Sequence, residues 1–71
     1  MLLPNGSMIK NDVIEAFDFA VGDPSNQKDG GINWDFVSAD MHMDLFGLYS
    51  DNYIHECFEA LVDSHLAWCE I

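Results

Sequence analysis

Apolar residues recur at helical spacing near the start of the chain. This face consists of Ile9, Val13, Phe17, Ala20 and Val21. The spacing predicts a first helix over residues 8–21. Either Ser7 or Asn11 can cap its start, and the turn-forming residues 22–24 end it. Residues 22–32 are polar and rich in turn residues, so we expect a loop there.

A second helix is predicted over residues 33–46, with Asn33 as its cap. One apolar face consists of Trp34, Val37, Met41 and Leu45. Three further apolar residues lie off this face: Phe36, Met43 and Phe46. We therefore expect this helix to be buried on two sides. Residues 41–45 also alternate between apolar and polar types, so a short strand is the alternative.

The third helix has the widest apolar stripe. After a turn at residues 47–50, it is predicted to run over residues 51–69, with Ser50 or Asp51 as its cap. The stripe consists of Ile54, Cys57, Phe58, Leu61, Val62 and Trp68. The chain is thus predicted to be an all-α, compact three-helix domain. The alternative is an α+β fold with a strand near residues 41–45.

The chain has 71 residues, enough for one domain over residues 1–71. Such a short chain buries only about 60% of the surface that its unfolded form exposes. Dimerisation would hide surplus apolar surface, so a homodimer is the alternative to a monomer. Residues 1–7 are interpreted either as native or as a tag or disordered segment before a start at Met8.

The two cysteines are not expected to form a disulfide with each other. Cys57 and Cys69 fall on one predicted helix, roughly 18 Å apart at 1.5 Å per residue. A disulfide requires Cα atoms within about 7 Å. Free cysteines fit a reducing cytosol. We therefore expect a cytoplasmic protein, and the host cytoplasm if the protein is viral.

Charge is the most informative property of the composition. Thirteen Asp and Glu residues stand against two Lys and no Arg, which gives a net charge of −11. Such a chain repels nucleic acid and anionic membranes, and no apolar run approaches the roughly 20 residues of a membrane span. We expect the partner to be a basic protein surface. The alternatives are acidity that serves solubility alone, or a salt-adapted host.

The acids also recur at helical spacing, which predicts stripes of negative charge. They group as Asp12, Glu15 and Asp18; as Asp40, Asp44 and Asp51; and as Glu56, Glu59, Asp63 and Glu70. Carboxylates at such spacing can bind Lys and Arg side chains that otherwise hold a phosphate backbone. The alternative is that they form the solvated faces of amphipathic helices.

Acidic stripes, small size and a lack of catalytic machinery resemble the phage-encoded DNA mimics, namely anti-restriction proteins, anti-CRISPR proteins and uracil-DNA glycosylase inhibitors. The resemblance covers the whole chain and is one of composition, so no residue role is carried over. It implies inhibition of a host nucleic-acid-binding enzyme. From the spacing, the predicted phosphate surrogates are Asp40, Asp44, Asp51, Glu56, Glu59 and Asp63.

The second hypothesis is a helical adaptor that binds a protein partner through apolar and aromatic residues. Tyr49 and Tyr53 flank the predicted turn near acidic residues, and tyrosine is frequent in binding hot spots. We expect these two side chains to be exposed aromatic anchors. An adaptor of this kind would be insensitive to charge reversal.

The third hypothesis is a degenerate calcium-loop regulatory module. Residues 15–36 resemble an EF-hand, but with Gly30 at loop position 6, position 12 is Phe36 instead of a bidentate Glu. Counting from Asp23 places Lys28 where the glycine belongs. A polar loop is therefore preferred to a calcium site.

Other chemistry has little support. His65 and Cys69 share a helix face, as do His55 and Glu59, but structural zinc requires four ligands, usually in close pairs. Acidic neighbours would raise the thiol pKa and suppress a cysteine nucleophile. There is no glycine-rich phosphate loop and no basic patch. We expect no metal, no cofactor and no enzymatic activity.

Overall fold

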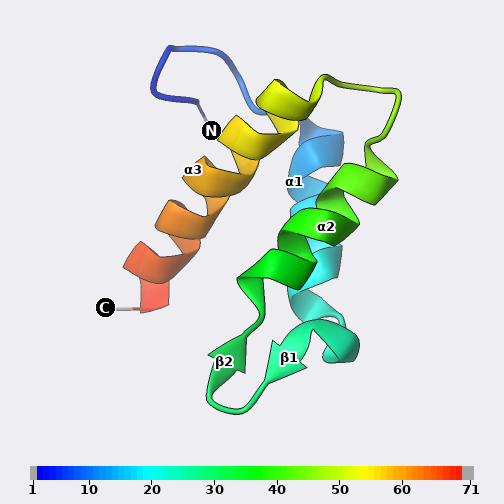
Figure 1. Cartoon of the computed structure of the whole chain (residues 1–71). Coiled ribbons are helices and arrows are strands. Elements are labelled where there is room, and N and C mark those ends of the chain that lie inside the picture. Colours follow the sequence, from blue (N-terminus) through cyan, green and yellow to red (C-terminus); the bar gives the residue numbers. More distant parts are fainter. Residues whose placement is uncertain (1, 70–71) are drawn as a thin grey trace.

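The computed structural model describes the backbone of residues 2–69 and the side chains of residues 2–66. Within this part, three helices and a small two-stranded sheet are formed (Figure 1). The helices are α1 (Asn11–Gly22), α2 (Trp34–Asp44) and α3 (Asp51–Cys69). A 3-10 turn, η1 (Pro24–Asn26), and the strands β1 (Gln27–Lys28) and β2 (Gly31–Ile32) join α1 to α2. The predicted helical class is confirmed, with a short hairpin added.

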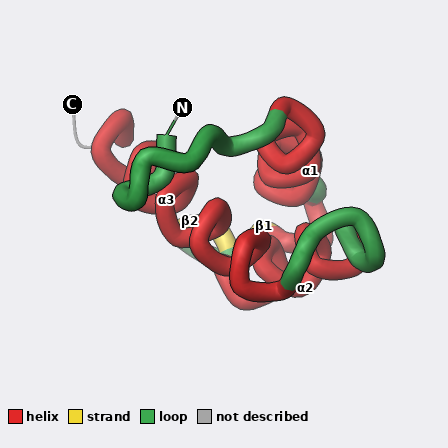
Figure 2. Tube along the Cα trace, turned by 90° about the horizontal axis from the view of Figure 1, so that it is seen from above, coloured by secondary structure: helices red, strands yellow, loops and turns green. Residues whose placement is uncertain are grey.

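The three helices pack around one core. α1 contacts both α2 and α3, and α2 also contacts α3. The hairpin lies at one end of the α1–α2 pair, whereas the N-terminal segment passes over α3 at the other end (Figures 1 and 2). No helix in the described part of the chain is long and apolar enough to cross a membrane.

The first helix begins later than the periodicity predicts. Met8 forms an isolated antiparallel bridge with Leu2, so residues 8–10 are extended rather than helical. Lys10 is the N-cap residue and makes no side-chain capping bond, so the prediction that Ser7 or Asn11 caps this helix was wrong. The predicted end is confirmed, because the Asp23 amide donates to the carbonyl of Ala20 and closes the last turn.

The prediction of an irregular loop at residues 22–32 was wrong in part. Asp23 Oδ1 accepts a hydrogen bond from the Ser25 amide at 3.0 Å and starts the 3-10 turn. β1 and β2 then pair in antiparallel register, with Lys28 opposite Gly31. Gly30 has φ +83°, a left-handed conformation that glycine adopts without a Cβ penalty, which lets the two strands connect directly.

The second helix is capped as predicted, since Asn33 Oδ1 accepts from the Phe36 amide at 3.4 Å. It ends at Asp44, two residues before the predicted end. The alternative strand over residues 41–45 was wrong, because residues 41–44 are helical. Burial on two sides was also wrong. The side chains off the predicted face are exposed: Phe36 by 54%, Met43 by 77% and Phe46 by 83%.

The third helix has the predicted bounds. Ser50 Oγ accepts from the Tyr53 amide at 3.2 Å, which confirms Ser50 as a cap. Gly47, with φ +82°, makes the preceding turn possible. The predictions on Trp68, Cys69 and Glu70 fall outside the side chains that the structure describes.

Buried residues from all three helices and from the segments before α1 and after α2 form the core: Leu3, Ile9, Val13, Ala16, Phe17, Ala20, Val37, Met41, Leu45, Ile54, Cys57 and Leu61. Leu3 is only 4% exposed, so the N-terminal segment packs with the helices. Its amide donates to the Ser7 carbonyl at 2.7 Å, which closes a tight loop beside α3. The interpretation of residues 1–7 as a tag stays untested.

Asn26 is the buried polar side chain that joins two elements of the fold. Its Nδ2 donates to the Ala20 carbonyl at 2.8 Å and to Asp40 Oδ2 at 2.7 Å. Asn26→Ala leaves both acceptors without this partner, so we expect a loss of about 1–3 kcal/mol in unfolding free energy. Urea unfolding followed by circular dichroism measures it. The exposed Asn52→Ala serves as control, and equal stabilities for the two variants would contradict this role.

Candidate functional site

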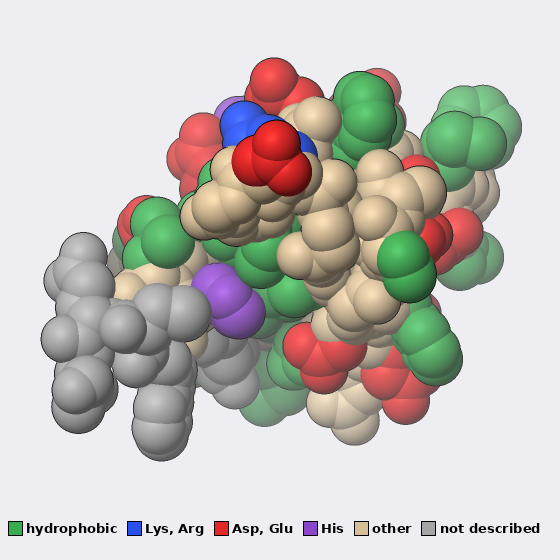
Figure 3. Space-filling view, turned by 90° about the horizontal axis from the view of Figure 1, so that it is seen from below, with side chains coloured by type: hydrophobic (Ala, Val, Ile, Leu, Met, Phe, Trp, Pro, Cys, Tyr) green, Lys and Arg blue, Asp and Glu red, His purple; other side chains and the backbone are tan. Residues whose placement is uncertain are grey.

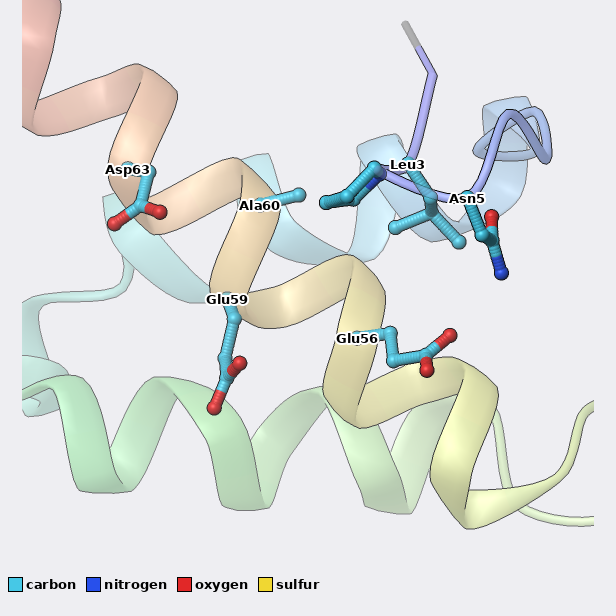
Figure 4. Close-up of a pocket in the computed structure, with 7 residues that line it drawn as sticks. Leu3, Asn5, Glu56, Glu59, Ala60 and Asp63 are labelled. Carbon is cyan, nitrogen blue, oxygen red and sulfur yellow. The ribbon is translucent and has the colours of Figure 1, made fainter.

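A groove lies between α3 and the N-terminal segment (Figure 4). Its volume is about 290 Å³, and it is lined by Leu3, Pro4, Asn5, Glu56, Glu59, Ala60 and Asp63. The groove thus brings together three of the six predicted phosphate surrogates. Leu3 and Asn5 lie across from the carboxylates, which follow one another along α3.

The three groove carboxylates, Glu56, Glu59 and Asp63, share a side of α3 because of their spacing. Positions three and four residues apart are neighbours on a helix and rise by about 4.5 and 6 Å along its axis. All three side chains are exposed. The core side of α3, with Ile54, is turned away from them. The three carboxylates are therefore exposed to solvent on the side of α3 that lines the groove.

Little positive charge offsets the acids. Within residues 2–66, each ion pair closer than 4.0 Å contains a histidine, and neither lysine forms one. His55 Nε2 lies 2.8 Å from Glu59 Oε1, and His42 Nδ1 lies 3.8 Å from Asp51 Oδ1. Neither lysine therefore offsets the groove carboxylates through a contact within that distance.

The other three predicted surrogates lie outside the groove. Asp40 is half-buried and accepts the hydrogen bond from Asn26, so its carboxylate already has a structural role. Asp44 is exposed at the end of α2, and Asp51 is exposed at the start of α3 beside His42. Figure 3 shows acidic side chains spread over the hairpin end of the molecule, with hydrophobic side chains between them.

Tyr49 and Tyr53 connect the start of α3 to the N-terminal part of the chain. Their ring centroids are 5.1 Å apart. The Tyr49 hydroxyl donates to the Asp12 carboxylate, with distances of 2.8 and 2.9 Å to its two oxygens. The Tyr53 hydroxyl donates to the Met8 carbonyl at 2.9 Å and accepts from the Lys10 amide at 3.1 Å. Both rings are half-buried, so they are less exposed than predicted.

Three groups in this region favour their neutral forms in the folded state. The hydrogen bond to Asp12 raises the pKa of Tyr49, and burial raises the pKa values of Tyr53 and Cys57. The Cys57 thiol therefore has suppressed reactivity, chiefly because it is buried rather than because acids surround it.

Stability is therefore expected to fall at alkaline pH. A group whose pKa is raised by folding stabilises the folded state fully at pH values below its ordinary pKa. This stabilisation is lost as the pH rises through the pKa of the group in the folded state. We expect the unfolding free energy to decline above about pH 9 to 10, where thiols and phenols ionise. Urea unfolding between pH 7 and 11 measures this. Tyr49→Phe should flatten the decline, and a stability that stays constant up to pH 11 would contradict the assignment.

Of the two pairs considered for zinc, His55 and Glu59 lie 2.8 Å apart, and the Cys69 side chain lies outside the described side chains. Within the described residues, no group of three or more His, Cys, Asp or Glu side chains converges on a metal-sized site. His65 lies edge-on to Trp34, with centroids 5.5 Å apart, and to Phe17 at 6.4 Å. In the suspected calcium loop, Asp23 caps η1 instead of converging with other acids.

Sequence reasoning missed two features of the surface. One is the far wall of the groove, since Leu3 and Asn5 belong to a segment to which no function was given. The other is the exposed apolar side of α2, with Phe36 and Met43. The sequence did indicate a second apolar side, because Phe36 and Met43 lie off the main apolar face of the helix. Periodicity does not tell whether a second apolar face is covered.

Comparisons of the chain with protein-family models, with curated proteins and with solved structures found no match. The evidence on function therefore consists of the groove, the charges and the exposed surfaces of this chain.

Proposed function

We propose that the protein is an acidic inhibitor of a host nucleic-acid-binding enzyme, of the kind that phages use against host defence. It would act by occupying the basic DNA- or RNA-binding surface of that enzyme. The observation that carries the proposal is the row of Glu56, Glu59 and Asp63 in an open groove, with no lysine within ion-pair distance among the described residues.

The spacing of the row suits this function. Neighbouring carboxylates in the row rise by about 4.5 and 6 Å along the helix axis. Phosphates along a nucleic-acid strand rise by about 3.4 Å each, so the two spacings are of similar size. Arg and Lys side chains arranged to hold phosphates form charge-assisted hydrogen bonds with carboxylates as well. A row of carboxylates can therefore compete for the same cationic side chains.

The overall charge supports fast association with such a target. A net charge of −11 attracts a basic surface over a distance set by the Debye length, about 8 Å at physiological salt. Electrostatic attraction of this kind raises the association rate and makes binding sensitive to salt. The same charge disfavours direct binding to nucleic acid.

An adaptor function is the second candidate, and the exposed side chains of Phe36, Met43 and Phe46 favour it. An adaptor that binds through these residues would tolerate neutralisation of the groove. Neutralisation of the groove carboxylates therefore separates the two candidates.

Capture from bacterial lysate tests the proposed function. The immobilised protein is exposed to lysate at about 0.1 M salt, with and without excess duplex DNA, and eluted by a salt step. We expect a nucleic-acid-binding enzyme whose capture is suppressed by DNA and reversed by salt. Partners that are indifferent to both DNA and salt would contradict the proposal.

A further inference from the structure

Helix α2 carries apolar residues on two opposite sides. Val37 and Met41 are buried in the core. On the other side lie the residues that we name the outer α2 stripe: Phe36, Ala39, Met43 and Phe46. Their spacing of three, four and three residues follows the 3.6-residue turn, so Phe36, Ala39 and Met43 line one face and Phe46 follows just beyond the helix end.

The outer α2 stripe is well exposed in the single chain. Met43 is 77% exposed and Phe46 is 83% exposed, although both are large apolar side chains. A hollow of about 410 Å³ is lined by His42, Met43 and Phe46. Scattered apolar residues on a surface are ordinary, whereas a continuous apolar row beside a hollow is typical of an interaction site.

Carboxylates border the stripe on both sides. At 3.6 residues per turn, Asp40 and Asp44 fall along one edge and Asp35 falls along the other. Asp35 and Asp44 are exposed. A second copy of this chain would bring the same negative charges against them, at a net charge of −11 per copy. A partner with cationic side chains beside an apolar row is complementary to this arrangement.

We infer that the outer α2 stripe binds a basic amphipathic helix of a partner protein. Large apolar side chains of that helix would pack on Phe36, Met43 and Phe46, with one entering the hollow beside His42. Lys and Arg residues flanking its apolar row would lie against Asp35 and Asp44. This is the binding of an amphipathic helix through anchors at i, i+3, i+4 and i+7.

This inference goes beyond the proposed function, because it concerns another surface. The outer α2 stripe shares no residue with the groove between α3 and the N-terminal segment. It does not require the protein to imitate DNA. A partner that offers both a basic surface and a basic amphipathic helix could be held at both places.

A model peptide tests the inference directly. The probe is an 18-residue fluorescein-labelled helix of Leu and Lys, with Leu at positions i, i+3, i+4 and i+7, titrated with the full chain and followed by anisotropy. The variant Phe36→Ser/Met43→Ser/Phe46→Ser should bind at least tenfold more weakly than wild type. Phe19→Ser alters a phenylalanine on α1 that is 77% exposed, and should change the affinity less than twofold.

Two further probes separate the contributions. A scrambled Leu/Lys peptide of equal charge should bind at least tenfold more weakly, since it lacks the apolar row. The groove variant Glu56→Gln/Glu59→Gln/Asp63→Asn should keep its affinity for the helical peptide within about threefold. If the groove did not bind the target enzyme, the peptide would still bind to the outer α2 stripe. A failure of the proposed function can therefore be distinguished from a failure of this inference.

Three results would overturn the inference. One is wild-type protein that does not bind the peptide. Another is equal binding by wild type and the triple serine variant, which would mean attraction by charge alone. The third is a dimer in sedimentation equilibrium that the triple serine variant dissociates, since the occupant would then be a second copy. Circular dichroism confirms that each variant is folded.

Discussion

Neutralising the groove is expected to abolish most of the binding to the target enzyme. The variant Glu56→Gln/Glu59→Gln/Asp63→Asn keeps side-chain size but removes three negative charges. Exposed ion pairs contribute up to about 1 kcal/mol each, so the loss should approach about 3 kcal/mol, or about 100-fold in Kd. Titration calorimetry or anisotropy with the captured enzyme at about 0.1 M salt measures this loss.

A variant with the same change in net charge is the matched control. Glu15→Gln/Asp18→Asn/Asp29→Asn neutralises three exposed acids that are not part of the groove. It should weaken binding by less than about fivefold, through the general field alone. Equal losses in both variants would show that net charge rather than the groove determines affinity. Lower self-repulsion should leave both variants at least as stable as wild type.

Ile54→Ala is expected to have the largest effect on stability. Ile54 is fully buried in the first half of α3 and belongs to the core shared by all three helices. Replacing a buried Ile by Ala lowers the unfolding free energy by about 2–5 kcal/mol. A chain of this size has about 4–11 kcal/mol of stability in total. We therefore expect a variant that loses about half of the unfolding free energy of the wild type.

Thermal and urea unfolding followed by circular dichroism check this prediction. The matched control is Ile14→Ala on α1, because Ile14 is only partly buried against the core. It should lose less than half as much unfolding free energy as Ile54→Ala. Similar losses at the two positions would mean that Ile54 does not occupy the centre of the core.

The parts of the fold that depend on local signals follow from the sequence. The bounds of α3 are predictable because its apolar stripe is wide and Ser50 caps it within the same segment. Asn33 caps α2 for the same local reason. The row of Glu56, Glu59 and Asp63 also follows from helical spacing alone.

Features that depend on distant contacts were not predictable in the same way. The start of α1 is displaced because Met8 pairs with Leu2 as extended backbone. The Lys10 amide also donates a hydrogen bond to the Tyr53 hydroxyl on α3. The two-residue strands are too short to give an alternating pattern. Whether Phe36 is covered depends on a neighbouring element, which periodicity does not report.

The groove itself illustrates the same limit. Its acidic side lies on one helix and could be predicted from the sequence. Its opposite side, with Leu3 and Asn5, depends on a tight loop in which the Leu3 amide bonds to the Ser7 carbonyl and the Leu3 side chain enters the core. A row of carboxylates becomes a groove only when that loop packs beside α3.

Competition with DNA on the captured enzyme is the most direct test of the proposed inhibition. Fluorescent duplex DNA is bound to the enzyme and the protein is added while anisotropy is recorded. We predict that wild-type protein releases the DNA fully and that Glu56→Gln/Glu59→Gln/Asp63→Asn needs about 100-fold more protein to do so. A stable ternary complex of enzyme, DNA and wild-type protein would contradict occupation of the nucleic-acid-binding surface.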